Sequence, residues 1–206
     1  MGLFISRAGS GAPSLTFRAF ILRVMYPNRM IRIRRVLESD LEAIRTIINR
    51  EIAENVAHFG LTETSAAEAL EDWRTNSAVY PWFIAELDGV VVGFAKGLAW
   101  QSRGAYEWAV QISVYVKPDF QSRGVGTMLY TALIDKVREL GFRCVIGGIA
   151  LPNDPSVRLH ESLGMNLVGT FPCVGYKHGK WIDVAYWALT FDGDDPPSPI
   201  EGWKGS

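Results

Sequence analysis

The sequence of 206 residues contains only two cysteines, Cys144 and Cys173, and both lie in apolar stretches typical of strands. Their spacing matches no metal-ligand pattern, and two cysteines inside apolar runs are typical of a reduced protein without a disulfide. We therefore predict no metal site, and two reduced core cysteines in a cytoplasmic protein.

A large charge excess is also missing, because 21 Lys and Arg residues face 22 Asp and Glu residues, a formal net charge of −1. Nucleic acids and anionic membranes attract basic surfaces, so the composition predicts neither partner. No apolar run reaches the length of about 18 residues that a membrane-spanning helix needs. With 48% hydrophobic residues, the chain has the composition of one globular domain with a substantial core.

The first 29 residues differ in composition from the remainder. They contain Arg7, Arg18, Arg23 and Arg29, several Ser, Gly and Pro, and no acidic residue. A transit peptide, a disordered tail and sequence upstream of the true start codon all fit this composition. We assign no function to this extension, and we predict a domain over residues 30–191 and a poorly packed tail over 192–206.

The hydrophobic pattern of the predicted domain alternates between the periods of strands and helices. Strands are expected over 31–36, 82–87, 90–95, 106–116, 143–150, 167–175 and 181–191, and helices over about 41–54, 65–76, 127–140 and 153–163. The resulting order is β-α-α-β-β-β-α-β-α-β-β. The strand at 143–150 is almost continuously apolar, which predicts a central position in the sheet.

The segment 114–127, VYVKPDFQSRGVGT, carries the clearest chemical signal. A strand ends before Lys117-Pro118, a loop containing Gly124 and Gly126 follows, and apolar residues then recur at helical spacing. The free N–H groups and the positive dipole end of such a helix form an anion site, which glycine lets a phosphate approach closely. No Gly-Lys-Ser/Thr follows, so the segment is not a P-loop, and the Rossmann pattern is absent as well.

The order Gln-x-x-Gly-x-Gly after this strand resembles the pyrophosphate loop of the GCN5-related N-acetyltransferases, which hold acetyl-CoA there. Over 31–191 the chain resembles the phosphinothricin N-acetyltransferases and their relatives that acetylate methionine sulfoximine and methionine sulfone. The stretches that carry this resemblance are 80–82, 114–116, 151–161 and 175–184. It implies an α/β (α+β) fold, the GNAT fold, in which a mixed central sheet is splayed at the acetyl-CoA site and helices cover both faces.

The same resemblance implies a homodimeric, metal-free N-acetyltransferase that moves acetyl from acetyl-CoA directly to a small amino-acid-like amine. It implies coenzyme contacts by Val114, Tyr115, Val116, Ser122, Arg123, Gly124, Val125, Gly126, Thr127, Asn153 and Ser156. For the acceptor it indicates Arg103, Phe59 and Tyr106. Two plainer interpretations stay open: Asn153 and Ser156 as an ordinary helix cap, and Arg103 as a solvated loop residue.

The step for which the sequence departs from the related enzymes is removal of the amine proton. Those enzymes carry a glutamate three residues before the strand valine, where this chain has Gln111. An amide cannot accept a proton near neutral pH, and the loss of a positioned base costs about 10²–10⁴-fold in rate. Either His160, which matches a catalytic histidine of the related enzymes, or the carboxylate of Glu51 or Glu54 replaces it, or the protein is a weak catalyst. The alternative function is a non-catalytic acetyl-CoA-binding sensor.

Overall fold

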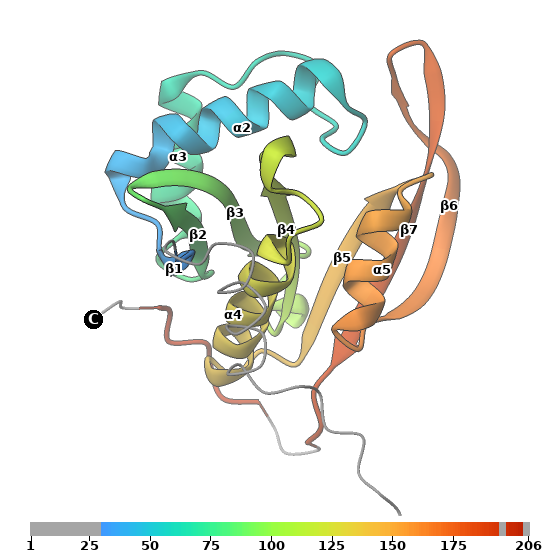
Figure 1. Cartoon of the computed structure of the whole chain (residues 1–206). Helices are drawn as coiled ribbons and strands as arrows, with labels where there is room; N and C mark the ends of the chain where they lie inside the picture. Colours follow the sequence, from blue (N-terminus) through green and yellow to red (C-terminus); the bar gives the residue numbers. More distant parts are fainter. Residues whose placement is uncertain (1–29, 194–196, 204–206) are drawn as a thin grey trace, which may run out of the picture. The chain divides into compact units, whose positions relative to one another are not determined.

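A computed structural model describes residues 30–193 and 197–203, so the predicted extension 1–29 lies outside the described residues. Seven strands form one sheet in the order β1-β2-β3-β4-β5-β7-β6 (Figure 1). The β4–β5 pair is parallel and the other neighbours are antiparallel, which makes the sheet mixed as predicted. The strands are β1 (Arg32–Arg35), β2 (Trp82–Leu87), β3 (Val90–Ala99), β4 (Ala109–Val116), β5 (Cys144–Ala150), β6 (Asn166–Lys177) and β7 (Lys180–Thr190).

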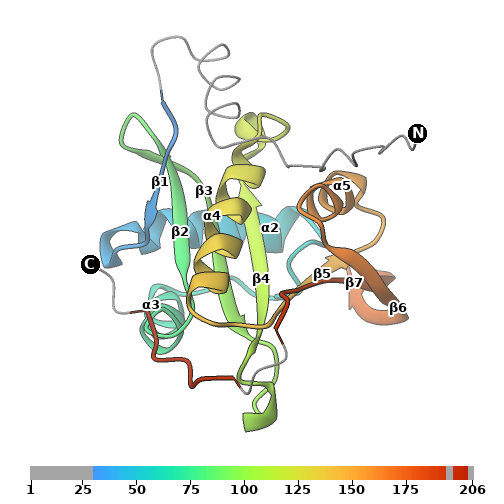
Figure 2. The same cartoon turned by 90° about the horizontal axis from the view of Figure 1, so that it is seen from below.

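Helices cover both faces of the sheet, again as predicted. Figure 2 shows α4 (Val125–Glu139) on one face, with α2 (Leu41–Glu54) and α3 (Ala66–Asn76) on the other, while α5 (Asp154–Ser162) lies beside β5. Three short 3-10 turns complete the described elements: η1 (Glu38–Asp40), η2 (Gly104–Tyr106) and η3 (Pro118–Phe120). Along the chain, α2 and α3 precede the central strands of the sheet, and α4 follows β4 after the turn η3.

Local sequence explains where the helices begin. Ser65 and Glu68 form a capping box at α3, since the Ser65 hydroxyl accepts from the Glu68 N–H and the Glu68 carboxylate accepts from the Ser65 N–H. In α2 the apolar side chains recur at helical spacing, and Ile44, Ile48 and their neighbours are buried against β2 and β3. A capping box therefore fixes the start of α3, and a buried apolar face holds α2 against the sheet.

The sheet is splayed between its two parallel strands. The β4–β5 ladder runs only from the Ala109–Cys144 pair to the Ile112–Gly147 pair. Beyond it, β4 stays paired with β3 as far as Val116, and β5 stays paired with β7 as far as Ala150. Each strand thus follows its antiparallel partner, and the two diverge toward their carboxyl ends (Figure 1).

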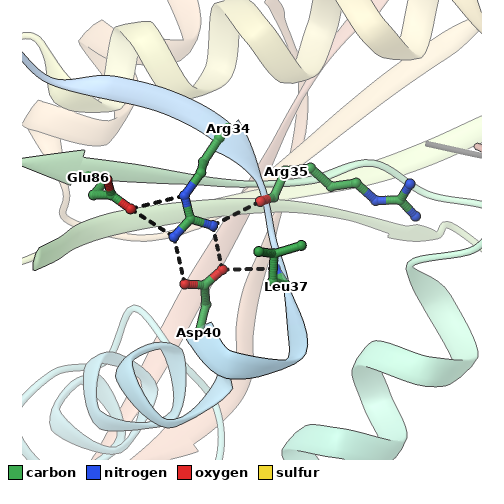
Figure 3. Close-up of polar contacts among 5 residues, drawn as sticks. All are labelled: Arg34, Arg35, Leu37, Asp40 and Glu86. Carbon is green, nitrogen blue, oxygen red and sulfur yellow. Dashed lines mark hydrogen bonds and ion pairs between the residues drawn. The ribbon is translucent and has the colours of Figure 1, made fainter. Parts of the chain in front are cut away.

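An ion-pair cluster joins the first strand to its surroundings at the edge of the sheet. The Arg34 guanidinium donates to both Asp40 oxygens at 2.7 and 2.8 Å, and to the Glu86 carboxylate at 2.8 and 2.9 Å (Figure 3). Asp40 also accepts from the Leu37 N–H at 2.8 Å. The cluster therefore connects β1, the turn η1 before α2, and β2.

Two expectations from the sequence are wrong. Cys173 is not in the core but exposed, because it occupies an irregular stretch of β6 with a φ of +51°; both cysteines are free. In the predicted tail, the Trp203 N–H donates to the Ala78 carbonyl at 2.8 Å and its ring lies 5.2 Å from the Phe83 ring, whereas residues 192, 193, 197–199 and 201 are exposed. The fourth strand begins at Ala109 instead of residue 106, because 104–106 form the turn η2.

Candidate active site

The splay opens into a cleft with a volume of about 980 Å³. Its lining comes from five segments: the end of α2 with residues 54–57, the carboxyl half of β4, the loop and first turns of α4, the end of β5, and residues 152–162 in and before α5. Among the described residues no group of three or more metal-type ligands occurs. A site of this shape accommodates an elongated ligand that passes between two strands.

The loop before α4 forms the anion-binding end of the cleft. Gly124 is the N-cap of α4 with a φ of +81°, a left-handed conformation that a side chain would strain. Of the four α-helices in the described part of the chain, α4 is the one without an acidic residue in its first turn. The positive end of the α4 dipole therefore faces the cleft without a carboxylate of its own helix to offset it.

The start of α5 forms the adjacent wall. Asn153 lines the cleft and also caps α5, because its side-chain oxygen accepts from the Ser156 N–H at 3.2 Å. The helix-cap interpretation is thus correct, and it coexists with a place in the cleft. A Cβ on Gly126 would lie 3.2 Å from the Leu159 Cδ2 atom, so glycine lets the first turn of α4 approach α5 closely.

His160 is buried at the inner side of this wall, with 2% of its surface exposed. Its Nδ1 lies 2.8 Å from the Ser156 carbonyl, which can only accept, so Nδ1 carries the proton and Nε2 is an acceptor. Burial lowers the pKa of His160, and the bond to the Ser156 carbonyl opposes that shift only in part. The imidazole is therefore neutral at pH 7, with its basic nitrogen turned toward Tyr130.

Tyr130 is a cleft residue that the sequence did not indicate. Its hydroxyl oxygen lies 3.5 Å from His160 Nε2, and the two rings meet edge to face with centroids 5.2 Å apart. Burial strongly raises the pKa of Tyr130, so the hydroxyl keeps its proton. At helical spacing in α4, Tyr130 has the pattern of a core residue, and the sequence contains no signal that sets it apart. Gly147 makes room for this pair, since a Cβ there would collide with the His160 ring.

Glu51 lies on the opposite side of the cleft, on the last turns of α2. It lines the cleft although only 8% of its surface is exposed. Burial raises the pKa of the Glu51 carboxyl, while a hydrogen bond with the Asn55 side chain and the charges of Arg50 and Lys177 act against the shift. The structure thus places a buried carboxyl in the cleft wall formed by the end of α2.

Lys177 holds this wall in place from the end of β6. Its ammonium group donates to the main-chain carbonyls of Asn55 and His58 at 2.7 and 2.6 Å, and it lies 3.5 Å from the Glu51 carbonyl. These carbonyls belong to the carboxyl end of α2 and the loop after it, where a positive charge is favourable. Only 3% of the surface of Lys177 is exposed.

The structure brings most of the predicted site residues together. Those that line the cleft are His160, Val114, Tyr115, Val116, Ser122, Gly124, Gly126, Thr127, Asn153 and Ser156. The predicted residues that do not line it are Gln111, Arg123, Val125, Arg103, Phe59 and Tyr106.

The residues outside the cleft lie in several parts of the fold, and Arg123 is exposed in the loop before α4. Gln111 pairs with Ile146 inside the intact part of the β4–β5 ladder, before the strands diverge. Val125 is buried in the core. Arg103 and Tyr106 are exposed at the turn before β4, and Phe59 lies close to Gly175 of β6, where a Cβ would approach its ring to 2.7 Å. Their roles in catalysis or acceptor binding stay predictions.

Comparison with known proteins identifies the architecture. Residues 43–165 match the model of the acetyltransferase (GNAT) family. The phosphinothricin N-acetyltransferase of Streptomyces viridochromogenes is 40% identical over 172 residues, which cover 84% of this chain and 94% of that protein. The L-methionine sulfoximine/L-methionine sulfone acetyltransferase of Salmonella typhimurium is 33% identical over 156 residues, covering 75% of this chain and 91% of the relative.

Solved structures agree. A phosphinothricin acetyltransferase from Sinorhizobium meliloti in complex with acetyl-CoA superposes with a TM-score of 0.78 at 31% identity, covering 84% of this chain and 95% of that one. An acetyltransferase from Salmonella typhimurium with its cofactor acetyl-CoA also reaches 0.78, at 32% identity, with 82% of this chain and 98% of that chain covered. Among the described residues, no helix has the length and apolar character needed to cross a membrane.

Proposed function

Because the chain belongs to the acetyltransferase (GNAT) family and is an acetyl-CoA-dependent N-acetyltransferase, we propose that its acceptor is the amino group of a small amino acid of the phosphinothricin or methionine sulfone type. The observation that carries this proposal is the cleft that opens where the β4–β5 ladder stops, between the α4 dipole and the end of α2. The related proteins named for these acceptors align with the whole of this region.

The cleft residues fit acetyl-CoA. Acetyl-CoA supplies the activated acetyl group as a thioester. The Gly124 turn and the first N–H groups of α4 would hold the pyrophosphate, and the unpaired edges of β4 and β5 would receive the pantetheine arm. Asn153 and Ser156 border the same path at the start of α5.

We assign His160 and Tyr130 to the closed inner side of the cleft, where the coenzyme sulfur is expected. The neutral His160 accepts through Nε2, and Tyr130 keeps a protonated hydroxyl. The hydroxyl has a single proton, so it donates either to His160 Nε2 or, once it has turned, to a departing thiolate, which needs a proton. In this proposal His160 orients Tyr130 and does not itself remove the amine proton.

The homodimer predicted from the resemblance is also part of the proposal. β6 is an edge strand, and its hairpin with β7 exposes large apolar side chains: Leu167, Val168, Phe171, Val174, Tyr176 and Trp181. An edge with so much apolar surface is typical of a contact with another chain. Light scattering of the wild type and of Val174→Lys tests the homodimer, and the variant is expected to be monomeric.

The two free cysteines fit the reducing cytoplasm as the compartment of the protein.

The test of the function is release of free CoA thiol from acetyl-CoA with a panel of amines. Phosphinothricin, methionine sulfone, methionine sulfoximine and the ordinary amino acids form the panel, with a lysine-containing peptide as a protein-like acceptor. Saturable turnover with one group of small amino acids is the expected result. Turnover with the peptide alone, or acetyl-CoA binding without turnover of any amine, would contradict the proposal.

A further inference from the structure

Gln111 leaves the reaction without its usual base, and the structure supplies another carboxylate. We propose that Glu51, on the last turns of α2, is the general base that takes the proton from the acceptor's ammonium group. The inference deepens the proposed function and rests on it. It assigns a catalytic role to a residue of α2, whereas the related enzymes carry a glutamate at the position of Gln111 in β4.

The position of Glu51 matches the acceptor side of the cleft. The α4 loop, the splayed strands and α5 form the walls assigned to the coenzyme, which leaves the end of α2 and residues 54–57 for the acceptor. Glu51 lies on that wall, and its charge acts on Tyr115 of β4, whose pKa is raised first by burial and then by this carboxylate. Glu51 therefore faces the strand along which the thioester is expected.

The other candidate bases are less suitable. Glu54 is more exposed and forms an ion pair with Arg50 at 2.8 Å. His160 is neutral, but its basic nitrogen faces the Tyr130 hydroxyl from the α5 side of the cleft. His58 accepts the Gly60 N–H through Nδ1 at 3.0 Å, so that nitrogen is already engaged. Gln111 belongs to the closed part of the ladder and is not a cleft residue.

The surroundings of Glu51 favour a carboxylate that can hold a proton. Burial raises its pKa, and Glu54 on the same helix adds to the rise, while Asn55, Arg50 and Lys177 oppose it. Lys177 directs its ammonium to three main-chain carbonyls instead of the carboxylate. A base is most effective when its pKa lies near the working pH, so a rise from the ordinary value of 4.5 improves Glu51 for this role.

The step balances without any further reagent. The acceptor enters as R–NH3⁺, and the Glu51 carboxylate takes one proton. The lone pair set free forms the N–C bond to the thioester carbonyl, and the C–S bond breaks. The sulfur leaves as a thiolate and takes the proton of the Tyr130 hydroxyl, and the second nitrogen proton returns to the Tyr130 oxygen. The products are therefore the amide, the thiol and the proton that Glu51 returns to solvent.

The experiment compares kcat/KM for methionine sulfone and phosphinothricin between pH 6 and 9. Glu51→Gln should lower kcat/KM by about 100-fold or more at pH 7. The loss should shrink as pH rises, because the fraction of free amine in solution grows and replaces the missing base. Glu51→Asp, which keeps a carboxylate, should recover part of the activity. The dissociation constant of acetyl-CoA should be the same in every variant, which shows that the coenzyme half of the site is intact.

Three further variants sharpen the result. Glu42→Gln removes a charge from the exposed first turn of the same helix and should leave kcat/KM unchanged. Glu54→Gln tests the neighbouring carboxylate as the base. Gln111→Glu should bring no gain in kcat/KM. A loss in Glu51→Gln that equals that of Glu42→Gln, a loss that does not vary with pH, or a tenfold gain in Gln111→Glu would overturn the role of Glu51. Absence of turnover by the wild type with every amine would instead overturn the proposed function.

Discussion

Two buried carboxylates, Asp40 at the sheet edge and Glu51 at the cleft, face opposite electrostatic surroundings. Asp40 is 6% exposed and Glu51 8%, so burial alone would raise the pKa of both. At Asp40 that rise is outweighed by hydrogen bonds from Arg34 and from the Leu37 N–H, and the pKa is lowered. At Glu51 burial prevails, and the pKa is raised.

The difference shows how one fold uses the same chemical group in two ways. Arg34 has a planar fork that matches the two oxygens of Asp40, and the pair is completed by Glu86 (Figure 3). The charge of Glu51 is offset by the Asn55 amide and by the charges of Arg50 and Lys177, but Lys177 directs its hydrogen bonds to main-chain carbonyls. Asp40 therefore stabilises the fold in its charged form, whereas Glu51 is kept reactive at some expense of stability.

The largest effect on stability is expected from removing the Asp40 carboxylate. Asp40→Ala leaves the Arg34 guanidinium without its bidentate partner and should destabilise the protein by about 3 kcal/mol, or roughly 6–12 °C in Tm. Thermal unfolding followed by circular dichroism measures the change. Glu38→Ala is the control, because its pair with Arg74 at 3.6 Å is exposed and should contribute little. A drop of the same size in both variants would contradict the assigned role of Asp40.

The next effect concerns Lys177, the residue that fixes the wall carrying Glu51. Lys177→Met leaves the Asn55 and His58 carbonyls without their donor and should destabilise the protein by about 2 kcal/mol. The KM for the acceptor should rise while acetyl-CoA affinity stays constant, since the displaced wall is the acceptor's. Lys180→Met, on the exposed far side of the same hairpin turn, should change stability by less than about 0.5 kcal/mol. Equal effects of the two variants on the KM would contradict the role of Lys177 in fixing the cleft wall that carries Glu51.

A smaller effect should appear in the pH dependence of stability, where the two carboxylates act with opposite sign. Asp40 has a lowered pKa, so its contribution is present above its ordinary value of 3.8 and is lost as pH falls through the folded value. Glu51 has a raised pKa, so stability declines as pH rises from 4.5 through the folded value. Urea unfolding of Asp40→Asn and Glu51→Gln between pH 3 and 8 should show these opposite slopes relative to wild type. Parallel curves would refute the contrast.

The smallest expected effect is a gain in the stability of the folded protein. Glu51→Gln removes a charge that burial disfavours, and it should stabilise the protein at pH 7 by no more than about 1 kcal/mol, because water in the cleft screens the carboxylate. Differential scanning calorimetry should find a higher Tm in the variant that loses most activity. A lower Tm would indicate that Glu51 serves the fold and would remove the contrast with Asp40.

Much of the architecture could be predicted from particular residues. The helix predicted over 65–76 corresponds to α3, and the apolar spacing that includes Ile44 and Ile48 predicted the buried face of α2. The glycine loop predicted the strand–loop–helix unit that became β4 and α4. These predictions succeed because caps, turns and periodic apolar faces depend on residues that are close along the chain.

The residues that the sequence misjudged depend on contacts between distant segments. Cys173 has apolar neighbours in the sequence, but its strand lies at the exposed edge of the sheet. Trp203 follows a Pro-rich stretch, yet Arg35 and Phe83 cover its ring from segments more than 100 residues away. Tyr130 resembles any core residue of a helix until α5 brings His160 beside it.

The sequence by itself determined the family, the order of the elements and the anion-binding loop, because each of these is encoded by neighbouring residues. Only the tertiary structure decided which carboxylates line the cleft and which of them is buried. Glu51 becomes a candidate base because the divergence of β4 and β5 opens the cleft beside α2. Lys177, 126 residues further along the chain, then fixes the α2 end through main-chain carbonyls and leaves the carboxylate only partly compensated. Burial and charge compensation are properties of assembled segments, and no local pattern of residues contains them.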